Sequence, residues 1–321
     1  MYRKGYYGKV SFMIPVISVG NIQVGGTGKT PFIAYLCEVL SEKYKIAVLS
    51  RGYKRSTFGF RLANDRDTYR QIGDEPYWLK KKFPHVAVAV SENRVEAIPN
   101  LLSYRYDTQL ILLDDGFQQL GIRLTKNILL TTYHRPFTKD FMLPAGRLRE
   151  PKSSCERADI IIVTKCPMET LNQKVKVLSD LDIRPAVHQK VFLSSIIYDT
   201  PYLMFYEGMV ENLQADEQII LITGIADAYP LLKYVQSKVK SVKHLKYPDH
   251  YKYRLSDLDK IENEYYTLSQ NGKVRILTTE KDAVRLEIFK EEIEDLKLEI
   301  YIQSIALKWD DEQALLEGIF S

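Results

Sequence analysis

A glycine-rich segment, residues 18–36 (SVGNIQVGGTGKTPFIAYL), constrains the fold of this chain more than any other feature. An apolar run that predicts a strand, residues 15–20, leads into it, and an amphipathic pattern that predicts a helix, residues 31–43, follows it. Glycines let backbone N–H groups converge without obstruction by Cβ atoms, and the N-terminus of a helix adds partial positive charge. The segment therefore predicts a phosphate-binding loop.

The loop departs from the strict template G-x-x-x-x-G-K-[ST], because Gln23 stands where the first glycine is required. Three glycines within four residues still precede a Lys-Thr pair, which favours a nucleotide site over a turn that only caps a helix. We expect Lys29 to reach the β- and γ-phosphates and the Thr30 hydroxyl to ligate Mg²⁺. The predicted phosphate-binding residues are Gly25, Gly26, Thr27, Gly28, Lys29 and Thr30.

The 321 residues are enough for two domains, and we place the boundary near residue 190. Strand patterns alternate with helical patterns along residues 1–190, which predicts an α/β, P-loop NTPase-like domain: a mostly parallel sheet with helices on both faces. Residues 191–321 predict a smaller α/β domain that contributes to the active-site cleft. The strands expected in the first domain are 15–20, 46–50, 86–90, 110–114, 128–132 and 159–164.

Composition narrows the classes of partner. The net charge of +4 and the pI near 8.6 suit an anionic ligand or a membrane surface and do not indicate nucleic acid. No window holds the roughly 20 apolar residues that cross a bilayer. Basic and aromatic residues at the N-terminus could contact lipid headgroups, although a solvated basic tail is the favoured interpretation; they are Tyr2, Arg3, Lys4, Tyr6, Tyr7, Lys9 and Phe12.

Two adjacent carboxylates, Asp114 and Asp115, follow the apolar run 110–113. Side by side at the end of a buried strand they repel each other unless a cation or hydrogen-bond donors are present. An acidic turn before Gly116 is an equally good interpretation of this stretch alone. Together with the Lys29 loop, a magnesium site is the better one.

Two classes of nucleotide-binding protein, GTPases and partition-type ATPases, are disfavoured because one residue of each class's motif is missing. The base-reading motif of GTPases, [NT]-K-x-D, begins at Thr164, but Pro167 stands where the Asp belongs. Partition-type ATPases place a second lysine at the head of the loop, where this chain has Val24.

Seven segments, taken together and in order, resemble the tetraacyldisaccharide 4'-kinase family over about residues 14–290. They are SVGNIQVGGTGKTP, SRGYKR, GDEP, DDGFQQ, LPAGRLREP, YPDH and TTEKDAVR. The family's loop carries its extra glycine at the position of Gly20, which accounts for Gln23. The family commonly has His where this chain has Gln119, and many relatives have a longer amphipathic N-terminal helix.

The resemblance implies ATP- and Mg²⁺-dependent phosphorylation of the 4'-hydroxyl of an acylated disaccharide 1-phosphate, in lipid A biosynthesis. It implies a peripheral protein at the cytoplasmic face of the Gram-negative inner membrane, and we expect a monomer. Another P-loop small-molecule kinase or ligase stays open as an alternative, as does a nucleotide-gated binding protein.

The resemblance also assigns roles to single residues around the phosphates. It implies that Asp114 lies in the magnesium shell, that Asp115 lies close to the transferred phosphoryl group, and that Glu150 is a second acidic residue near the metal. Arg147 and Arg149 have forked guanidinium groups suited to phosphate oxygens. A surface ion pair with Glu150 or Glu156 is the alternative for these arginines.

For proton transfer, the resemblance implies that Asp74 in GDEP is the general base and that His250 in YPDH, from the second domain, orients it or shares the proton. Asp74 could instead cap a helix, and His250 could be an ordinary loop residue. Arg51, Tyr53 and Glu75 are assigned to the substrate, with a solvated basic loop as the alternative for the first two.

Overall fold

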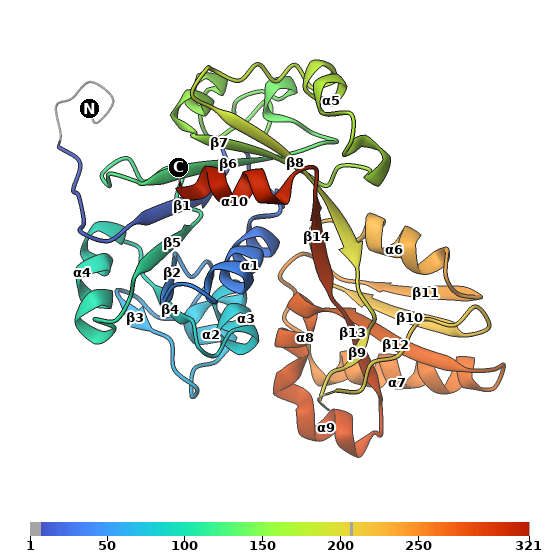
Figure 1. Cartoon of the computed structure of the whole chain (residues 1–321). Helices are drawn as coiled ribbons and strands as arrows, with labels where there is room; N and C mark the ends of the chain where they lie inside the picture. Colours follow the sequence, from blue (N-terminus) through green and yellow to red (C-terminus); the bar gives the residue numbers. More distant parts are fainter. Residues whose placement is uncertain (1–7, 206–207, 321) are drawn as a thin grey trace. The chain divides into compact units, whose positions relative to one another are not determined.

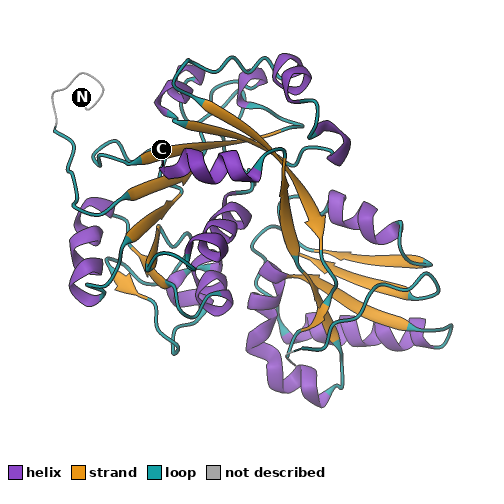
Figure 2. Cartoon of the chain, viewed as in Figure 1, coloured by secondary structure: helices purple, strands orange, loops and turns teal. Residues whose placement is uncertain are grey.

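The computed structural model of the chain describes residues 8–205 and 208–320, and it divides into two α/β units (Figures 1 and 2). Unit 1 comprises Met1–Ile197 and Ala306–Ser321, and unit 2 comprises Tyr198–Ile305. The basic and aromatic residues at positions 2–7, for which a solvated tail is favoured over lipid contact, lie outside the described part of the chain. Among the described residues, no helix has the length and apolar character that crossing a membrane requires.

A nine-stranded sheet forms the centre of unit 1. Its strands are β1 (Val16–Gly20), β2 (Ile46–Ser50), β3 (Arg61–Leu62), β4 (Ala87–Val90), β5 (Leu110–Asp114), β6 (Lys126–Thr132), β7 (Ile160–Thr164), β8 (Lys190–Tyr198) and β14 (Ile305–Trp309). Their spatial order is β14-β8-β7-β6-β1-β5-β2-β4-β3. The pairs from β4 across to β8 are parallel, and β3 is antiparallel to β4. The predicted mostly parallel sheet is confirmed, and β2 and β5 have the predicted bounds.

Helices cover both faces of this sheet because its central strands are apolar on both sides. The helices of unit 1 are α1 (Lys29–Leu40), α2 (Tyr69–Ile72), α3 (Asp74–Lys82), α4 (Arg94–Tyr104), α5 (Lys174–Asp180) and α10 (Glu312–Phe320). Ile111 and Leu113 of β5 share one core cluster with Ile98 and Leu101 of α4. Successive side chains of a strand point to opposite faces, so the buried residues between them face the other layer.

Strand β14 and helix α10 return to unit 1 after the chain has built unit 2. The Trp309 ring lies with its centroid 5.6 Å from Phe32 and 5.0 Å from Tyr35, both on α1. The Tyr35 hydroxyl donates to Glu312 Oε1 at 2.8 Å. The predicted second domain, 191–321, therefore differs from unit 2 at its C-terminal side, because packing against α1 draws residues 306–321 back.

Unit 2 is a smaller α/β layer with a five-stranded sheet in the order β11-β10-β12-β13-β9. Its strands are β9 (Tyr202–Leu203), β10 (Gln218–Thr223), β11 (Ser241–Lys246), β12 (Val274–Thr279) and β13 (Ile300–Gln303); its helices are α6 (Tyr229–Gln236), α7 (Leu255–Ser269), α8 (Glu280–Leu286) and α9 (Lys290–Asp295). Ile220 and Ile222 pack in one cluster, and Ile219 and Leu221 in the opposite one. In the described part of this sheet, β9 runs antiparallel to β13, whereas β11, β10, β12 and β13 pair in parallel.

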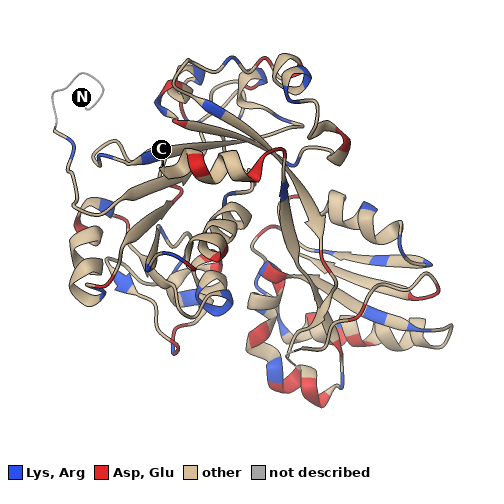
Figure 3. Ribbon diagram, viewed as in Figure 1, with Lys and Arg blue, Asp and Glu red and all other residues tan. Residues whose placement is uncertain are grey.

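Charged side chains of both signs are interspersed over both units (Figure 3). Acidic residues gather on α9, whose sequence is KEEIED. The mixture accords with the small net charge of +4.

Candidate active site

The loop between β1 and α1 has the backbone geometry of a phosphate-binding loop. Gly25 and Gly28 have φ angles of 110° and 85°, in the left-handed region that favours glycine. A Cβ atom at Gly26 would meet no described atom within 4 Å, so the loop is open there. All residues of α1 are described, and its first turn contains no acidic side chain that would neutralise the positive end of the helix dipole. An anion can therefore meet free partial positive charge at this end of the helix.

Buried side chains hold the loop in shape. Asn21 Nδ2 donates to Thr27 Oγ1 at 2.7 Å, and the Thr164 hydroxyl donates to the carbonyl oxygen of Thr27 at 2.9 Å. The side chain of Thr27 is thus engaged within the loop. Lys29 and Thr30, the first two residues of α1, are half-buried at the loop's end.

Gln23, the residue that departs from the strict template, is a structural anchor. Its Nε2 donates to Asp140 Oδ2 at 3.0 Å and to the Arg135 carbonyl at 3.2 Å, and its Oε1 accepts from Thr131 at 3.3 Å. A Cβ atom at Gly20, where the family has its extra glycine, would lie 2.6 Å from Phe117 Cβ. The glycine is needed there because β1 touches the turn that follows β5.

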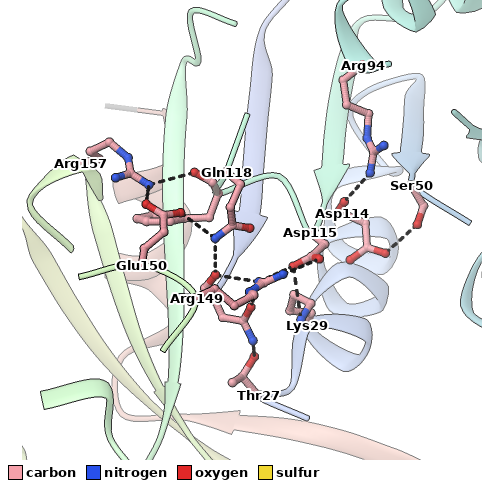
Figure 4. Close-up of polar contacts among 12 residues, drawn as sticks. Thr27, Lys29, Ser50, Arg94, Asp114, Asp115, Gln118, Arg149, Glu150 and Arg157 are labelled. Atoms are coloured by element: carbon pink, nitrogen blue, oxygen red, sulfur yellow. Dashed lines mark hydrogen bonds and ion pairs between the residues drawn. The ribbon is translucent and has the colours of Figure 1, made fainter. Parts of the chain in front are cut away.

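Asp114 ends β5 and is buried. Ser50 Oγ, at the end of β2, donates to Asp114 Oδ2 at 3.0 Å, and Arg94 Nη2 donates to the Asp114 carbonyl oxygen at 3.4 Å (Figure 4). Burial raises the pKa of the Asp114 carboxyl above its ordinary value, and the neighbouring Asp115 raises it further, against the positive charge of Lys29. This carboxylate therefore gains strongly from any cation that binds beside it.

Asp115 lies between two cations. Its Oδ1 is 3.4 Å from Lys29 Nζ, and both of its oxygens accept from the Arg149 guanidinium, at 3.0 and 3.2 Å (Figure 4). Burial opposes ionisation of the carboxyl, but the Lys29 charge and the Arg149 hydrogen bonds outweigh it, so the pKa of Asp115 lies below its ordinary value. Its φ of 52° is in a region that Asp tolerates better than most residues.

A chain of polar contacts connects this pair to Glu150. Arg149 Nη2 also donates to the Asn21 carbonyl oxygen at 2.9 Å and to the Asn21 side chain. Gln118 Nε2 donates to the same carbonyl at 2.8 Å and to Glu150 Oε1 at 2.9 Å, and Arg157 pairs with Glu150 Oε2 at 2.7 Å (Figure 4). Arg149 thus pairs with Asp115, and the ion-pair partner of Glu150 is Arg157.

The segments SRGYKR and GDEP meet at two glycines. A Cβ atom at Gly73 would lie 3.2 Å from Gly52 Cα, and both residues have positive φ, 96° and 67°. Helix α3 begins at Asp74, and its N-cap is Gly73, so Asp74 does not cap the helix. Arg51 and Tyr53 are exposed, and Asp74 and Glu75 are half-buried. The negative charge of Glu75 contributes to raising the pKa of Asp114, which places GDEP within electrostatic reach of the acidic strand end.

His250 lies in unit 2, in the loop after β11, with a φ of 60°. Its backbone N–H donates to the Gly224 carbonyl oxygen at 3.1 Å. Arg285 Nη1 donates to that same carbonyl at 3.1 Å and to the Tyr251 carbonyl at 3.4 Å, so buried groups of α8 hold the loop. Asp74 and His250 belong to different units, and their pairing stays a prediction.

Within the described residues, no group of three or more His, Cys, Asp or Glu side chains gathers as a metal cage. Mg²⁺ seldom needs one, since it is commonly bound by one or two carboxylates together with substrate phosphates and water. Asp114, a buried carboxylate within electrostatic reach of Lys29, fits that donor set. Thr30, Asp114 and Glu150 are the predicted Mg²⁺ ligands. We expect oxygens of the nucleotide's phosphates to complete the coordination of the ion.

A model of the family described as tetraacyldisaccharide-1-P 4'-kinase matches residues 1–320. The chain is 40% identical over 321 residues to the tetraacyldisaccharide 4'-kinase of Phocaeicola vulgatus, covering 98% of this chain and 87% of that protein. It is 41% identical over 306 residues to that of Bacteroides fragilis, covering 93% and 81%. The chain belongs to the tetraacyldisaccharide-1-P 4'-kinase family.

A solved structure has the same fold. LpxK from Aquifex aeolicus, crystallised in complex with ATP, is 27% identical to this chain, with a TM-score of 0.72 over 99% of this chain and 91% of that one. The predicted P-loop NTPase-like fold and the predicted family are therefore confirmed.

Several residues of this 4'-kinase family site escaped the sequence analysis. Ser50 ends a predicted strand, Arg94 is the first residue of α4, and Asn21 and Gln118 lie inside the segments that carry the family resemblance. Their place in the sequence could have suggested them. Each residue lies at or near the carboxyl end of a parallel strand, which is the edge of the sheet where α/β folds bind ligands. Arg94 is a buried arginine, 1% exposed, which a sequence pattern does not reveal.

Proposed function

We propose that this protein transfers the γ-phosphoryl group of ATP to the 4'-hydroxyl of a tetraacyldisaccharide 1-phosphate, with Mg²⁺, in lipid A biosynthesis. One observation carries the proposal: Asp115 pairs with both Lys29 and Arg149 beside a glycine-rich loop that is open at Gly26. Family membership and an ATP complex of a relative of the same fold support it.

Phosphate binding falls to groups that the loop already orients. Amides of Gly25, Gly26 and Gly28, together with the N-terminus of α1, would meet the phosphate oxygens, and Thr27 fixes the loop. Lys29 and Arg149 hold positive charge beside the loop, and Asp115 pairs with both side chains there. The two cations can exchange Asp115 for phosphate oxygens, which costs little because the region is only half-buried.

The metal would be held by Thr30, Asp114 and Glu150, together with phosphate oxygens. Bound Mg²⁺ neutralises charge on the phosphates during transfer. Ser50 orients Asp114 by the hydrogen bond to Oδ2, and Arg94 fixes the strand end through the backbone. Gln118 and Arg157 hold both oxygens of Glu150, so this carboxylate acts from a fixed position.

Acceptance of the sugar proton is assigned to Asp74, with His250 orienting it or sharing the proton. A positioned base contributes about 10²–10⁴-fold to a rate. Arg51, Tyr53 and Glu75 are assigned to the sugar and its phosphate. We place the protein peripherally at the cytoplasmic face of the Gram-negative inner membrane, as a monomer that binds no nucleic acid.

The test is transfer of labelled γ-phosphate from ATP to an acylated disaccharide 1-phosphate in detergent. Lys29→Ala should abolish transfer, whereas Lys43→Ala, an exposed lysine just past the far end of α1, should not change it. Asp74→Ala should lose transfer but keep ATP binding by calorimetry, with His250→Ala less affected. Equal phosphorylation of soluble, unacylated sugars would instead favour a general small-molecule kinase.

A further inference from the structure

A run of five consecutive non-polar residues, Phe141–Ala145, is exposed on unit 1. We call it the apolar loop tip. Its large side chains Phe141, Met142 and Leu143 are 68%, 42% and 51% exposed. Single exposed apolar residues are normal on a protein surface, but an uninterrupted exposed run of this length is a feature that folding alone does not favour.

The tip is built rigidly and is tied to the phosphate-binding loop. Buried Asp140 accepts at Oδ1 from the N–H groups of Phe141 and Arg147, at 2.8 and 3.1 Å, and at Oδ2 from Gln23. A Cβ atom at Gly146 would lie 2.6 Å from Asp140 Oδ1, so only glycine closes this loop. Val24 N–H, within the glycine-rich loop, donates to the Arg147 carbonyl at 2.8 Å.

Exposed cations surround the tip. Lys139, Arg147 and Lys152 are all exposed, and Lys152 Nζ lies 5.7 Å from the centre of the Phe141 ring. The acids within residues 133–152 are Asp140 and Glu150, and both are engaged: Asp140 is buried among its donors, and Glu150 pairs with Arg157. From α5, the exposed Asp180 also lies beside this segment, since Lys139 Nζ donates to its carbonyl oxygen at 2.6 Å. The exposed charges next to the apolar side chains within residues 139–152 are cationic.

We infer that the apolar loop tip inserts into the headgroup layer of an anionic phospholipid bilayer, with Lys139 and Lys152 against the lipid phosphates. A few apolar side chains ringed by lysine and arginine are what interfacial binding uses. Three large side chains are too few for a stable protein interface, which buries about 800 Å² on each partner. The inference rests on the proposed function for its purpose: it sets the phosphate loop beside the layer that holds an acylated substrate.

The test is co-sedimentation of the full chain with vesicles of phosphatidylethanolamine and phosphatidylglycerol, compared with vesicles of phosphatidylcholine alone. The triple variant Phe141→Ser, Met142→Ser, Leu143→Ser should lose about tenfold or more in vesicle partition. Lys139→Gln with Lys152→Gln should lose about fivefold per lysine, and only with anionic vesicles at low salt. The matched control is Val175→Ser with Val187→Ser, which are 85% and 109% exposed elsewhere on unit 1 and should leave partition unchanged.

Detergent kinase assays and light scattering separate the remaining outcomes. Unchanged vesicle partition of the triple variant overturns the inference, and a raised KM for the acylated substrate would then assign the tip to the substrate's acyl chains. A wild-type dimer that the triple variant dissociates without lipid also overturns it, in favour of a second copy. Loss of partition with kinase turnover retained supports it, and a wild type that binds vesicles through the tip but transfers no phosphate would refute only the proposed function.

Discussion

Two acidic residues near the ends of parallel strands have opposite surroundings in the two units. In unit 1, Asp114 ends β5 with one hydroxyl donor at its Oδ2, and burial raises its pKa. In unit 2, Asp282 follows β12 in the first turn of α8, and protein groups fill its coordination. Its Oδ1 accepts from Gly224 N–H and from the Tyr253 hydroxyl, both at 2.9 Å, and its Oδ2 accepts from Thr279 at 2.7 Å.

The neighbouring arginines show the same contrast. Arg149 beside Asp115 is half-buried, and its contacts can be exchanged for ligand oxygens. Arg285 is 1% exposed, its Nη1 lies 3.4 Å from Asp282 Oδ1, and it donates to the carbonyl oxygens of Gly224 and Tyr251. An acid with spare lone pairs at a strand end is suited to binding, whereas one saturated by buried donors is suited to holding a loop.

The largest effect is expected from a substitution at Asp114, the acidic residue of unit 1 in this comparison. Asp114→Asn should lower kcat/KM by about a hundred- to a thousandfold, because the substitution removes the negative charge that we propose binds Mg²⁺. The free energy of unfolding should be unchanged or higher, since burial disfavours the ionised carboxyl that is removed. Kinase assays at several magnesium concentrations and urea denaturation measure the two. A large loss of stability would mean that Asp114 is structural, like Asp282.

The matching change in unit 2 should do the reverse. Asp282→Asn leaves Arg285 buried without its countercharge, so we expect the free energy of unfolding to fall by about 3 kcal/mol. Magnesium dependence should stay that of the wild type. Asp295→Asn, exposed on α9, is the control and should change stability little. Wild-type stability of Asp282→Asn in urea denaturation would contradict the contrast.

A smaller effect is expected at Arg149. Arg149→Lys keeps the charge but loses the two-pronged contact with Asp115 and the contact with Asn21, so we expect about tenfold lower kcat/KM. Arg184→Lys, whose side chain is 90% exposed, serves as the control for an arginine without such geometry. Full activity of Arg149→Lys would show that only the charge is used.

The smallest effect is a pH dependence at Asp115. Its folded pKa is lowered, so its contribution to stability is present above the unfolded value, about 3.9, and is lost as pH falls through the folded value. The stability difference between wild type and Asp115→Asn should be constant near neutrality and disappear in acid. A difference that persists below the folded pKa would mean that the Lys29 and Arg149 pairs do not favour the ionised form.

Most of the fold could be predicted because unit 1 alternates apolar strands with amphipathic helices in an order typical of parallel sheets. Strand β5 has its predicted bounds for that reason. The return of β14 and α10 could not be predicted, because it depends on Trp309 meeting Phe32 and Tyr35 across a long stretch of intervening chain. The pairing of Glu150 with Arg157 also depends on tertiary packing that the spacing of charges leaves open.

The insertion of unit 2 between β8 and β14 has a consequence for synthesis on the ribosome. Strand β8 is translated before unit 2, but its sheet neighbour β14 and the tryptophan against α1 are translated after it. The first part of unit 1 therefore leaves the exit tunnel with the edge of β8 unpaired and helix α1 not yet covered by Trp309. Both stay exposed while unit 2 is translated. A chaperone that protects nascent chains would find its target there.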